Sequence, residues 1–342
     1  KLFKIFDMLE EESKTLSETI STRPPYEGEA IRLGVSQCLL GEKVRYDGGH
    51  SKNNFVSSTL EPWVEFVPVC PEVESGMPIP RPTIRLVNLE DNIHLVSPST
   101  NEDFTESMNT YSKERVAQLK KNELDGFILK RSSPSCGMAR VKIYREGKVY
   151  KRDGVGLFAN NLMNLWPNLP VEEEGRLNDL RLRENFISRI FNRNRWRILI
   201  KNGIDRGALV RFHTAHKLLL LSHNEAKYRK LGNIVGSLGT APDKTIFSEY
   251  EKEFHAAFKS IPTTKKHINV ILHALGHLKT HLNPKEKKEI ITAIEDFRSG
   301  FLPLLVPLNL IAYNMRIHNI DYLLNQIYFS PHPKELMLRN HA

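Results

Sequence analysis

Three short apolar runs, each typical of a buried strand, are followed in this chain by its only three cysteines. The runs span residues 31–36, 63–69 and 127–130, and the cysteines that follow them are Cys38, Cys70 and Cys136. Parallel strands of an open α/β sheet end at one edge, and such sheets bind their ligands there. We therefore expect the three thiols to converge on one place, and this expectation constrains the fold more than any other feature does.

The pattern up to residue 165 alternates strand-like runs with helical spacing of apolar residues. Further strands are expected at residues 84–89, 93–96, 141–144 and 148–150, and helices at residues 108–122 and 157–165. This alternation predicts an α/β N-terminal domain with a largely parallel sheet.

The sequence pattern changes beyond Trp166. Pro167 and Pro170 indicate a linker, and an acidic run at residues 172–174 follows it. Apolar residues then recur at helical spacing at residues 180–199, 209–222, 246–260, 267–282, 284–299 and 303–315. A mostly α-helical C-terminal domain is expected. The predicted divisions are an N-terminal extension over residues 1–30 with a short amphipathic helix, an α/β domain over residues 31–165 and a helical domain over residues 170–340.

The formal net charge of +9 belongs to the C-terminal part of the 342 residues. Residues 1–165 carry 22 Lys and Arg against 23 Asp and Glu, whereas residues 166–342 carry 27 against 17. A polyanion, and nucleic acid first, is the partner that this asymmetry favours for the helical domain. A basic domain that is merely soluble is the equally weighted alternative.

The cysteine spacing narrows the chemistry. Gaps of 32 and 66 residues separate Cys38, Cys70 and Cys136, so close-pair zinc-finger patterns and the cysteine run of bacterial ferredoxins are excluded. Three converging thiolates can hold a metal cluster and leave one iron without a protein ligand. Buried cysteines without any ligand are the usual alternative.

An odd cysteine count argues against paired disulfides, so a reducing cytoplasm is the expected location. No stretch is long enough to span a bilayer, and the first twenty residues are too polar for a secretory signal.

Candidate catalytic and substrate-binding residues flank the cysteines. Glu72 stands two residues after Cys70 behind Pro71 and can act as a general base, although a solvated loop glutamate is the plain alternative. The hydroxyls of Ser133 and Ser135, before Cys136, can bind a polar substrate or form a turn.

The loop that follows Cys38 is dense in polar side chains. There Arg45 and Tyr46 can stack on or hydrogen-bond a base, which Asp47 can orient, and a loop ion pair between Arg45 and Asp47 is the competing interpretation. The proline-rich segment at residues 78–82 can form a wall of the site, with Arg81 facing an anion.

Arginines and a tryptophan in the helical domain are side chains that commonly bind RNA. They can contact phosphates and stack on bases, and the predicted RNA-binding residues are Arg183, Arg193, Arg195, Trp196, Arg197 and Lys217. His273, His277 and His281 share one helical face, where a polar surface is favoured over metal ligation because no nearby thiol or carboxylate completes a set.

Four motifs carry a family resemblance. They lie at Val35–Gly41, Val44–Gly49, Val69–Val73 and Ser133–Gly137. Through them residues 31–155 resemble the family once catalogued as domain of unknown function 523, whose characterised members are TudS-type thiouracil desulfidases. Gln37, where a small residue is more usual, and Gly76-Met77 in place of Gly-Leu depart from its pattern.

Residues 156–340 resemble domain of unknown function 1722. The motifs here are Pro170–Leu177, Arg183–Phe186 and Phe212–Lys217. The combination is similar to the YbgA/RudS type, whose RudS members remove sulfur from 4-thiouridine in tRNA.

The resemblance implies a 4Fe-4S cluster held by Cys38, Cys70 and Cys136 with one open iron, and catalytic importance for Glu72 and Ser133. The expected activity is a non-redox, hydrolytic desulfidation of 4-thiouridine in tRNA, and of thiouracil as a small-molecule substrate. Two alternatives stay open, a desulfidase for free thiouracil alone and a nucleic-acid-binding iron–sulfur redox sensor.

Overall fold

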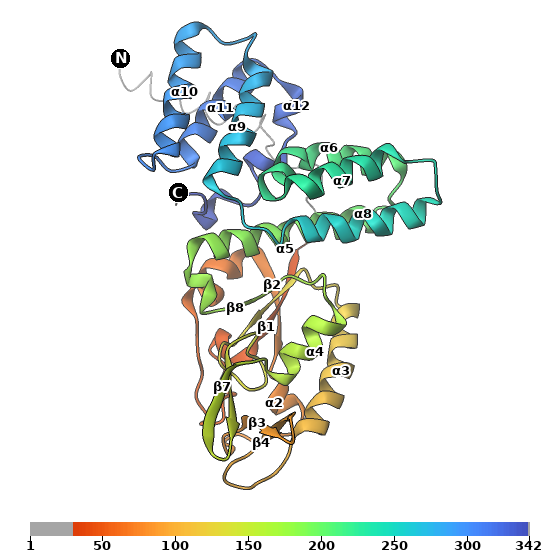
Figure 1. The fold of residues 1–342 in the computed structure, drawn as a ribbon, viewed down its shortest axis with the longest axis vertical. Helices are drawn as coiled ribbons and strands as arrows, with labels where there is room; N and C mark the ends of the chain where they lie inside the picture. The colour runs from red at the N-terminus through yellow and green to blue at the C-terminus, as the bar shows by residue number, and fades with distance from the viewer. Residues whose placement is uncertain (1–29, 341–342) are drawn as a thin grey trace, which may run out of the picture.

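The computed structural model describes residues 30–340 of the chain. The amphipathic helix expected in the N-terminal extension lies outside these residues. An α/β half and a helical half lie one above the other in Figure 1, and helix α5 (Leu180–Lys201) runs between them.

The α/β half is built around sheet A, which is parallel throughout and has the strand order β2-β1-β5-β8. Its strands are β1 (Ile31–Ser36), β2 (Val64–Val69), β5 (Gly126–Leu129) and β8 (Val171–Glu173). All four strands run in the same direction, so their carboxyl ends share one edge of the sheet.

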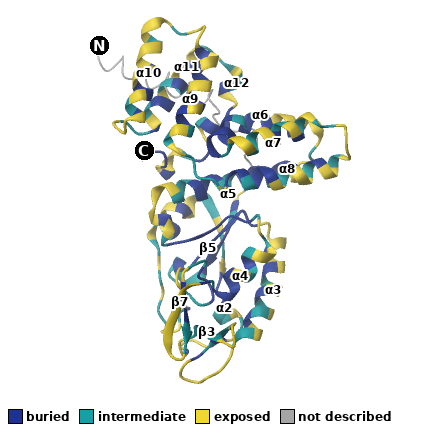
Figure 2. Ribbon diagram, viewed as in Figure 1, coloured by how far each residue is buried: buried dark blue, intermediate teal, exposed yellow. Residues whose placement is uncertain are grey.

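Both faces of sheet A are covered, as a parallel sheet requires. On β5, Phe127 and Leu129 pack with α3 (Thr105–Lys121) and α4 (Leu157–Leu165). Ile128 faces the other way and packs with α5 and with the π-helix at Phe55–Leu60. The sheet is thus the middle of three layers. Strands β1, β5 and β8 are largely buried, as the dark blue of β5 in Figure 2 shows, whereas the edge strand β2 is mostly half-buried or exposed.

A second, mixed sheet B lies at the end of the α/β half away from the helical half (Figure 1). Its order is β4-β3-β6-β7, from β3 (Arg85–Leu89), β4 (Asn92–Val96), β6 (Val141–Arg145) and β7 (Lys148–Gly154). Strand β3 pairs antiparallel with β4, as expected for this hairpin, and parallel with β6.

The acidic run that follows the expected linker is a strand. Val171–Glu173 forms β8 at the edge of sheet A, paired with β5, and Glu172, Glu173 and Glu174 are each 6% exposed. The sequence analysis predicts no strand here, because three consecutive carboxylates are rarely buried; in the fold, backbone N–H groups and basic side chains satisfy them.

The helical half holds one large apolar core. Its helices after α5 are α6 (Arg206–His223), α7 (Glu225–Gly236), α8 (Asp243–Ala257), α9 (Thr264–Leu278), α10 (Pro284–Arg298), α11 (Leu305–Ile317) and α12 (Asp321–Leu324). Helix α5 contributes Trp196 and Leu199 to this core and Phe186, Ile187 and Ile190 to the face of sheet A. The two halves therefore share a helix rather than meeting at a flexible joint.

Candidate active site

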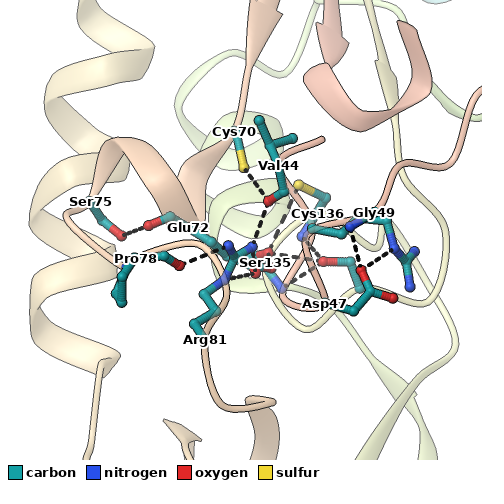
Figure 3. A network of polar contacts seen from close by, with 12 residues as sticks. Val44, Asp47, Gly49, Cys70, Glu72, Ser75, Pro78, Arg81, Ser135 and Cys136 are labelled. Carbon is teal, nitrogen blue, oxygen red and sulfur yellow. Dashed lines mark hydrogen bonds and ion pairs between the residues drawn. The ribbon is translucent and has the colours of Figure 1, made fainter. Parts of the chain in front are cut away.

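The three cysteines line one cavity at the carboxyl edge of sheet A. Cys38 lies in a 3-10 turn after β1, Cys70 precedes helix α2 (Pro71–Glu74) after β2, and Cys136 lies in the loop after β5. The cavity has a volume of about 380 Å³, and all three cysteines are free thiols. Figure 3 shows the sulfur atoms of Cys70 and Cys136 beside the polar residues of its wall. The expected convergence of the thiols is observed.

Cys70 and Cys136 are buried and Cys38 is half-buried, and as thiolates the three could bind a metal centre. Burial raises the pKa of the Cys38 thiol to about 11, with Cys70 adding to the effect. Burial likewise raises the pKa of Cys70 and, well above its ordinary value, that of Cys136. Buried thiolates need a positive partner to be stable.

The spacing of the possible ligands fits a polynuclear cluster better than a single ion. Within residues 30–340 no three Cys, His, Asp or Glu side chains lie close enough together to hold one metal ion. An iron–sulfur cluster takes its thiolates on separate irons, and therefore accepts a wider spacing.

Glu72 is the only carboxylate among the described residues that line this cavity. It lies in the first turn of α2, where Pro71 follows Cys70 directly. Arg81 donates from Nε to Glu72 Oε2 at 3.0 Å, and the Ser135 hydroxyl donates to Oε1 at 2.5 Å. The Arg81 and Glu72 side chains are 4% and 15% exposed. Arg81 thus faces an anion as expected, and that anion is the candidate base itself (Figure 3).

The loop at Ser133–Gly137 is tight, and it separates the roles of its two serines. Ser133 Oγ accepts from the backbone N–H of Cys136 at 3.0 Å and also lines the cavity. A Cβ at Gly137 would lie 2.7 Å from the Ser133 carbonyl oxygen, so only glycine allows this turn. Ser135 is wholly buried, does not belong to the described lining of the cavity and donates its hydroxyl to Glu72.

The sequence analysis missed two carboxylates that bind the backbone of the loop carrying Cys136. Glu174 accepts from Lys130 Nζ and from the Arg131 N–H, at 2.5 and 2.7 Å, and Glu173 accepts from the Met138 N–H at 2.8 Å. Glu173 of strand β8 and Glu174 directly after it therefore hold both ends of the loop that carries Cys136. The available signal was the acidic run directly after Val171, which resembles a linker unless its burial is known.

Glu74 fixes the backbone of Cys70 in a similar way. Its Oε1 accepts from the Cys70 N–H at 2.9 Å, and its Oε2 is bound by Tyr111 and Arg115 of α3. The chain position of Cys70 is therefore fixed by a helix packed on the face of sheet A.

Arg45 and Tyr46 line the cavity, whereas Asp47 does not belong to its described lining. Asp47 accepts from the Gly49 N–H at 3.0 Å and lies 3.5 Å from Arg45 Nε (Figure 3). The Gly49 N–H lowers the pKa of this exposed carboxyl. The loop ion pair weighed for this motif is therefore present.

The indole and most of the guanidinium groups predicted to bind RNA are occupied within the protein. Trp196 is 3% exposed and packs against Phe212 and Tyr250 in the helical core, so base stacking by its indole is excluded in this fold. Arg195 is 6% exposed and donates to the Pro331 carbonyl. Arg193, Arg195, Trp196 and Arg197 are nearly consecutive, so they point to different sides of α5, which is buried on two sides. These predicted RNA-binding residues therefore do not form one surface.

The other predicted RNA contacts lie at the opposite edge of sheet A or near its face. Arg193 donates to the Leu124 carbonyl and Arg197 pairs with Asp125, and both acceptors directly precede β5. Arg183 donates to the Leu177 carbonyl and stacks on Phe55. Lys217 is half-buried on α6. None of these six residues belongs to the described lining of the cysteine cavity.

Known proteins resemble both halves. Residues 33–174 match the family described as 2-thiouracil desulfurase. The chain is also 30% identical over 109 residues to the uncharacterized protein YbbK of Bacillus subtilis strain 168, covering 30% of this chain and 71% of YbbK. The chain belongs to the 2-thiouracil desulfurase family.

The helical half of this desulfurase-family chain matches a second family over residues 217–333, described as a protein of unknown function, DUF1722. The chain is 28% identical over 165 residues to the uncharacterized protein YbgA of Escherichia coli strain K12, covering 48% of this chain and 98% of YbgA. The predicted joining of a TudS-type domain to a DUF1722 domain is confirmed.

A solved structure, that of the 4Fe-4S-dependent thiouracil desulfidase TudS, is 28% identical; it covers 46% of this chain and 98% of that chain, with a TM-score of 0.37. Between residues 30 and 340, no helix combines the length and the apolarity that crossing a membrane requires.

Proposed function

We propose that this chain is a desulfidase that converts 4-thiouridine in tRNA to uridine and sulfide, with a 4Fe-4S cluster held by Cys38, Cys70 and Cys136. One observation carries the proposal. Three free thiols and one firmly held carboxylate, Glu72, share the wall of a single cavity. Membership of the 2-thiouracil desulfurase family supports the thiocarbonyl as the reacting group.

The bound cluster would supply a thiophilic Lewis acid that draws electron density from the thiocarbonyl. Glu72 takes a proton from a water whose oxygen bonds to the ring carbon. The carbon–sulfur bond then breaks as the new hydroxyl gives up its proton and becomes the carbonyl. Sulfur leaves as hydrogen sulfide with this proton and the one that Glu72 returns. Carbon exchanges sulfur for oxygen without any change in oxidation state, so the reaction needs no oxidant or reductant.

The chain's own residues hold Glu72 ready for this step. Arg81 fixes Oε2 and Ser135 fixes Oε1, so the carboxylate cannot rotate away from the cavity. Ser133, Arg45 and Tyr46 complete the wall, where they can position the base. The tRNA partner is supported by the positive charge of residues 166–342 and by three exposed lysines on α10, Lys285, Lys287 and Lys288.

The decisive experiment is anaerobic purification with cluster reconstitution, then incubation with 4-thiouridine-containing tRNA and with free 4-thiouracil. Loss of thione absorbance and release of sulfide are followed together. Turnover on tRNA supports the proposal in full, and turnover on the free base alone leaves the helical half without a role in catalysis. An intact cluster with no turnover on either substrate overturns the proposal and favours a redox sensor.

A further inference from the structure

Four basic side chains line the cysteine cavity, and three of them have a carboxylate partner. Arg81 pairs with Glu72, Lys130 with Glu174 and Arg45 with Asp47. The fourth is Arg131. Its guanidinium is exposed and makes no ion pair or hydrogen bond with any residue between 30 and 340. The mouth of the cavity therefore carries one uncompensated positive charge.

The position of this free guanidinium is nevertheless specified. The Arg131 N–H donates to Glu174 Oε2 at 2.7 Å, which fixes the start of the side chain. Further out the side chain lies against Gly175. A Cβ built on Gly175 would come within 2.4 Å of Arg131 Cδ and 3.0 Å of Nη1. Any side chain at position 175 would displace the guanidinium.

Gly175 has no backbone reason to be glycine. Its φ of −69° and ψ of −32° are ordinary helical values that every residue adopts. Within the described residues, the three nearest neighbours that a Cβ would meet are all atoms of Arg131. The glycine thus makes room for the arginine, and the arginine has nothing within the protein to bind.

We propose that Arg131, seated against Gly175, binds a phosphate group of the nucleotide whose base enters the cavity. A planar guanidinium fork matches phosphate oxygens in a bidentate way, and an exposed one keeps its charge for a ligand. The inference rests on the proposed function and deepens it, because it assigns a residue to the phosphate that a nucleotide carries and a free base lacks. The phosphate can belong to a mononucleotide or to an RNA chain, and the shared chemistry is the same.

Binding of sulfur-free ligands tests the subsite without any turnover. The reconstituted protein is titrated with uridine, with uridine 5′-monophosphate and with a short uridine-containing RNA at low salt. We expect the phosphorylated ligands to bind about tenfold more tightly than uridine, as one charged hydrogen-bonded contact provides. That preference should shrink as salt rises.

Three variants separate position from charge. Arg131→Ala removes the guanidinium, and Gly175→Ala keeps it but pushes it away. Both should reduce the preference for phosphate to about onefold. Arg316→Ala removes another exposed arginine, on α11 in the helical half and outside the described cavity lining, and should keep the preference.

The outcomes are separable. A preference for the monophosphate identifies a terminal phosphate, and a preference for the RNA alone identifies a phosphodiester; both support the subsite. Equal binding of all three ligands by the wild type overturns it, as does an Arg131→Ala variant that keeps the full preference. If the subsite stands but the thiolated forms of these ligands are not turned over, the proposed function fails and the phosphate site does not.

Discussion

Two buried arginine–carboxylate pairs lie at opposite edges of sheet A, and they differ in what surrounds them. At the carboxyl edge Arg81 holds Glu72, whose side chain is 15% exposed and faces a cavity with three thiols. At the amino edge Arg197 holds Asp125, which is fully buried. Asp125 also accepts from the Arg32 N–H and from Asn194, so both of its carboxylate oxygens have hydrogen-bond partners.

The comparison teaches that the pair itself does not identify a functional site. Both pairs join a strand end to a neighbouring element through a guanidinium. The first leaves a carboxylate at the wall of a cavity, whereas the second closes the contact between α5 and the sheet. The cavity and its thiols mark the carboxyl edge as the candidate site. The same kind of arginine–carboxylate pair at the amino edge contributes to the stability of the fold.

Removing a thiol should give the largest effect on the carboxyl edge. In Cys136→Ser the proposed cluster would lose one of its three protein ligands, and we expect its visible absorbance and the desulfidase turnover to fall below detection. Iron and sulfide content after anaerobic reconstitution measure the loss. A variant that retains a full complement of iron and turns over normally would remove Cys136 from the ligand set.

Glu72→Gln should separate binding from chemistry at the same edge. The amide keeps the size of the side chain but cannot take up a proton, so kcat on 4-thiouridine should fall about 10²- to 10⁴-fold while the cluster spectrum is unchanged. Single-turnover desulfidation of reconstituted protein measures this. A redox sensor would instead keep its cluster and its response to oxidation in the variant.

At the amino edge, Asp125→Ala should cost stability rather than catalysis. It leaves Arg197 with a weakened set of buried partners, so the free energy of unfolding should fall by about 3–5 kcal/mol. Denaturant titration measures the loss, and kcat of the folded protein should stay within about twofold.

Asp91→Ala is the matched control for that loss. It removes an Asp that is 93% exposed and pairs with Arg145, and the cost should stay below about 1 kcal/mol. A similar loss in both variants would contradict the distinction between the buried pair and the exposed one.

Mild acid should weaken the helical half before the α/β half. Burial lowers the pKa of His213 to about 4 and that of His223 and His332 to about 3. The folded state then binds fewer protons than the unfolded state, so this stability is complete above pH 6.5 and is lost as the pH falls toward 4 and 3. Each such histidine can cost about 2 kcal/mol between pH 6.5 and 5.

Hydrogen exchange of the two halves at pH 7.5 and 5 measures the difference. Among residues 30–165 the histidines are His50 and His94, and neither is buried. Equal loss of protection in both halves would show that they unfold as one unit.

Strong periodicity made much of the α/β half predictable. The strand at Ile31–Ser36 and the helix at Leu157–Leu165 have the expected bounds, and the thiols converge because parallel strands end together. Strand β8 was not predictable, because burial of Glu173 and Glu174 depends on partners that are 35 to 44 residues away along the chain. Trp196 was misplaced for a related reason, since a helix packed on two sides hides residues that its sequence shows as a basic and aromatic patch.

The continuity of β8 with α5 decides where this chain can be divided. A fragment that stops at residue 165 keeps every proposed cluster ligand but lacks the carboxylates that clasp the Cys136 loop. The match to the desulfurase family ends at residue 174, directly after the last of them. The boundary between the two halves therefore falls at the residues that support the Cys136 loop. A gene fusion or excision at this boundary would alter the cysteine cavity without changing a cysteine.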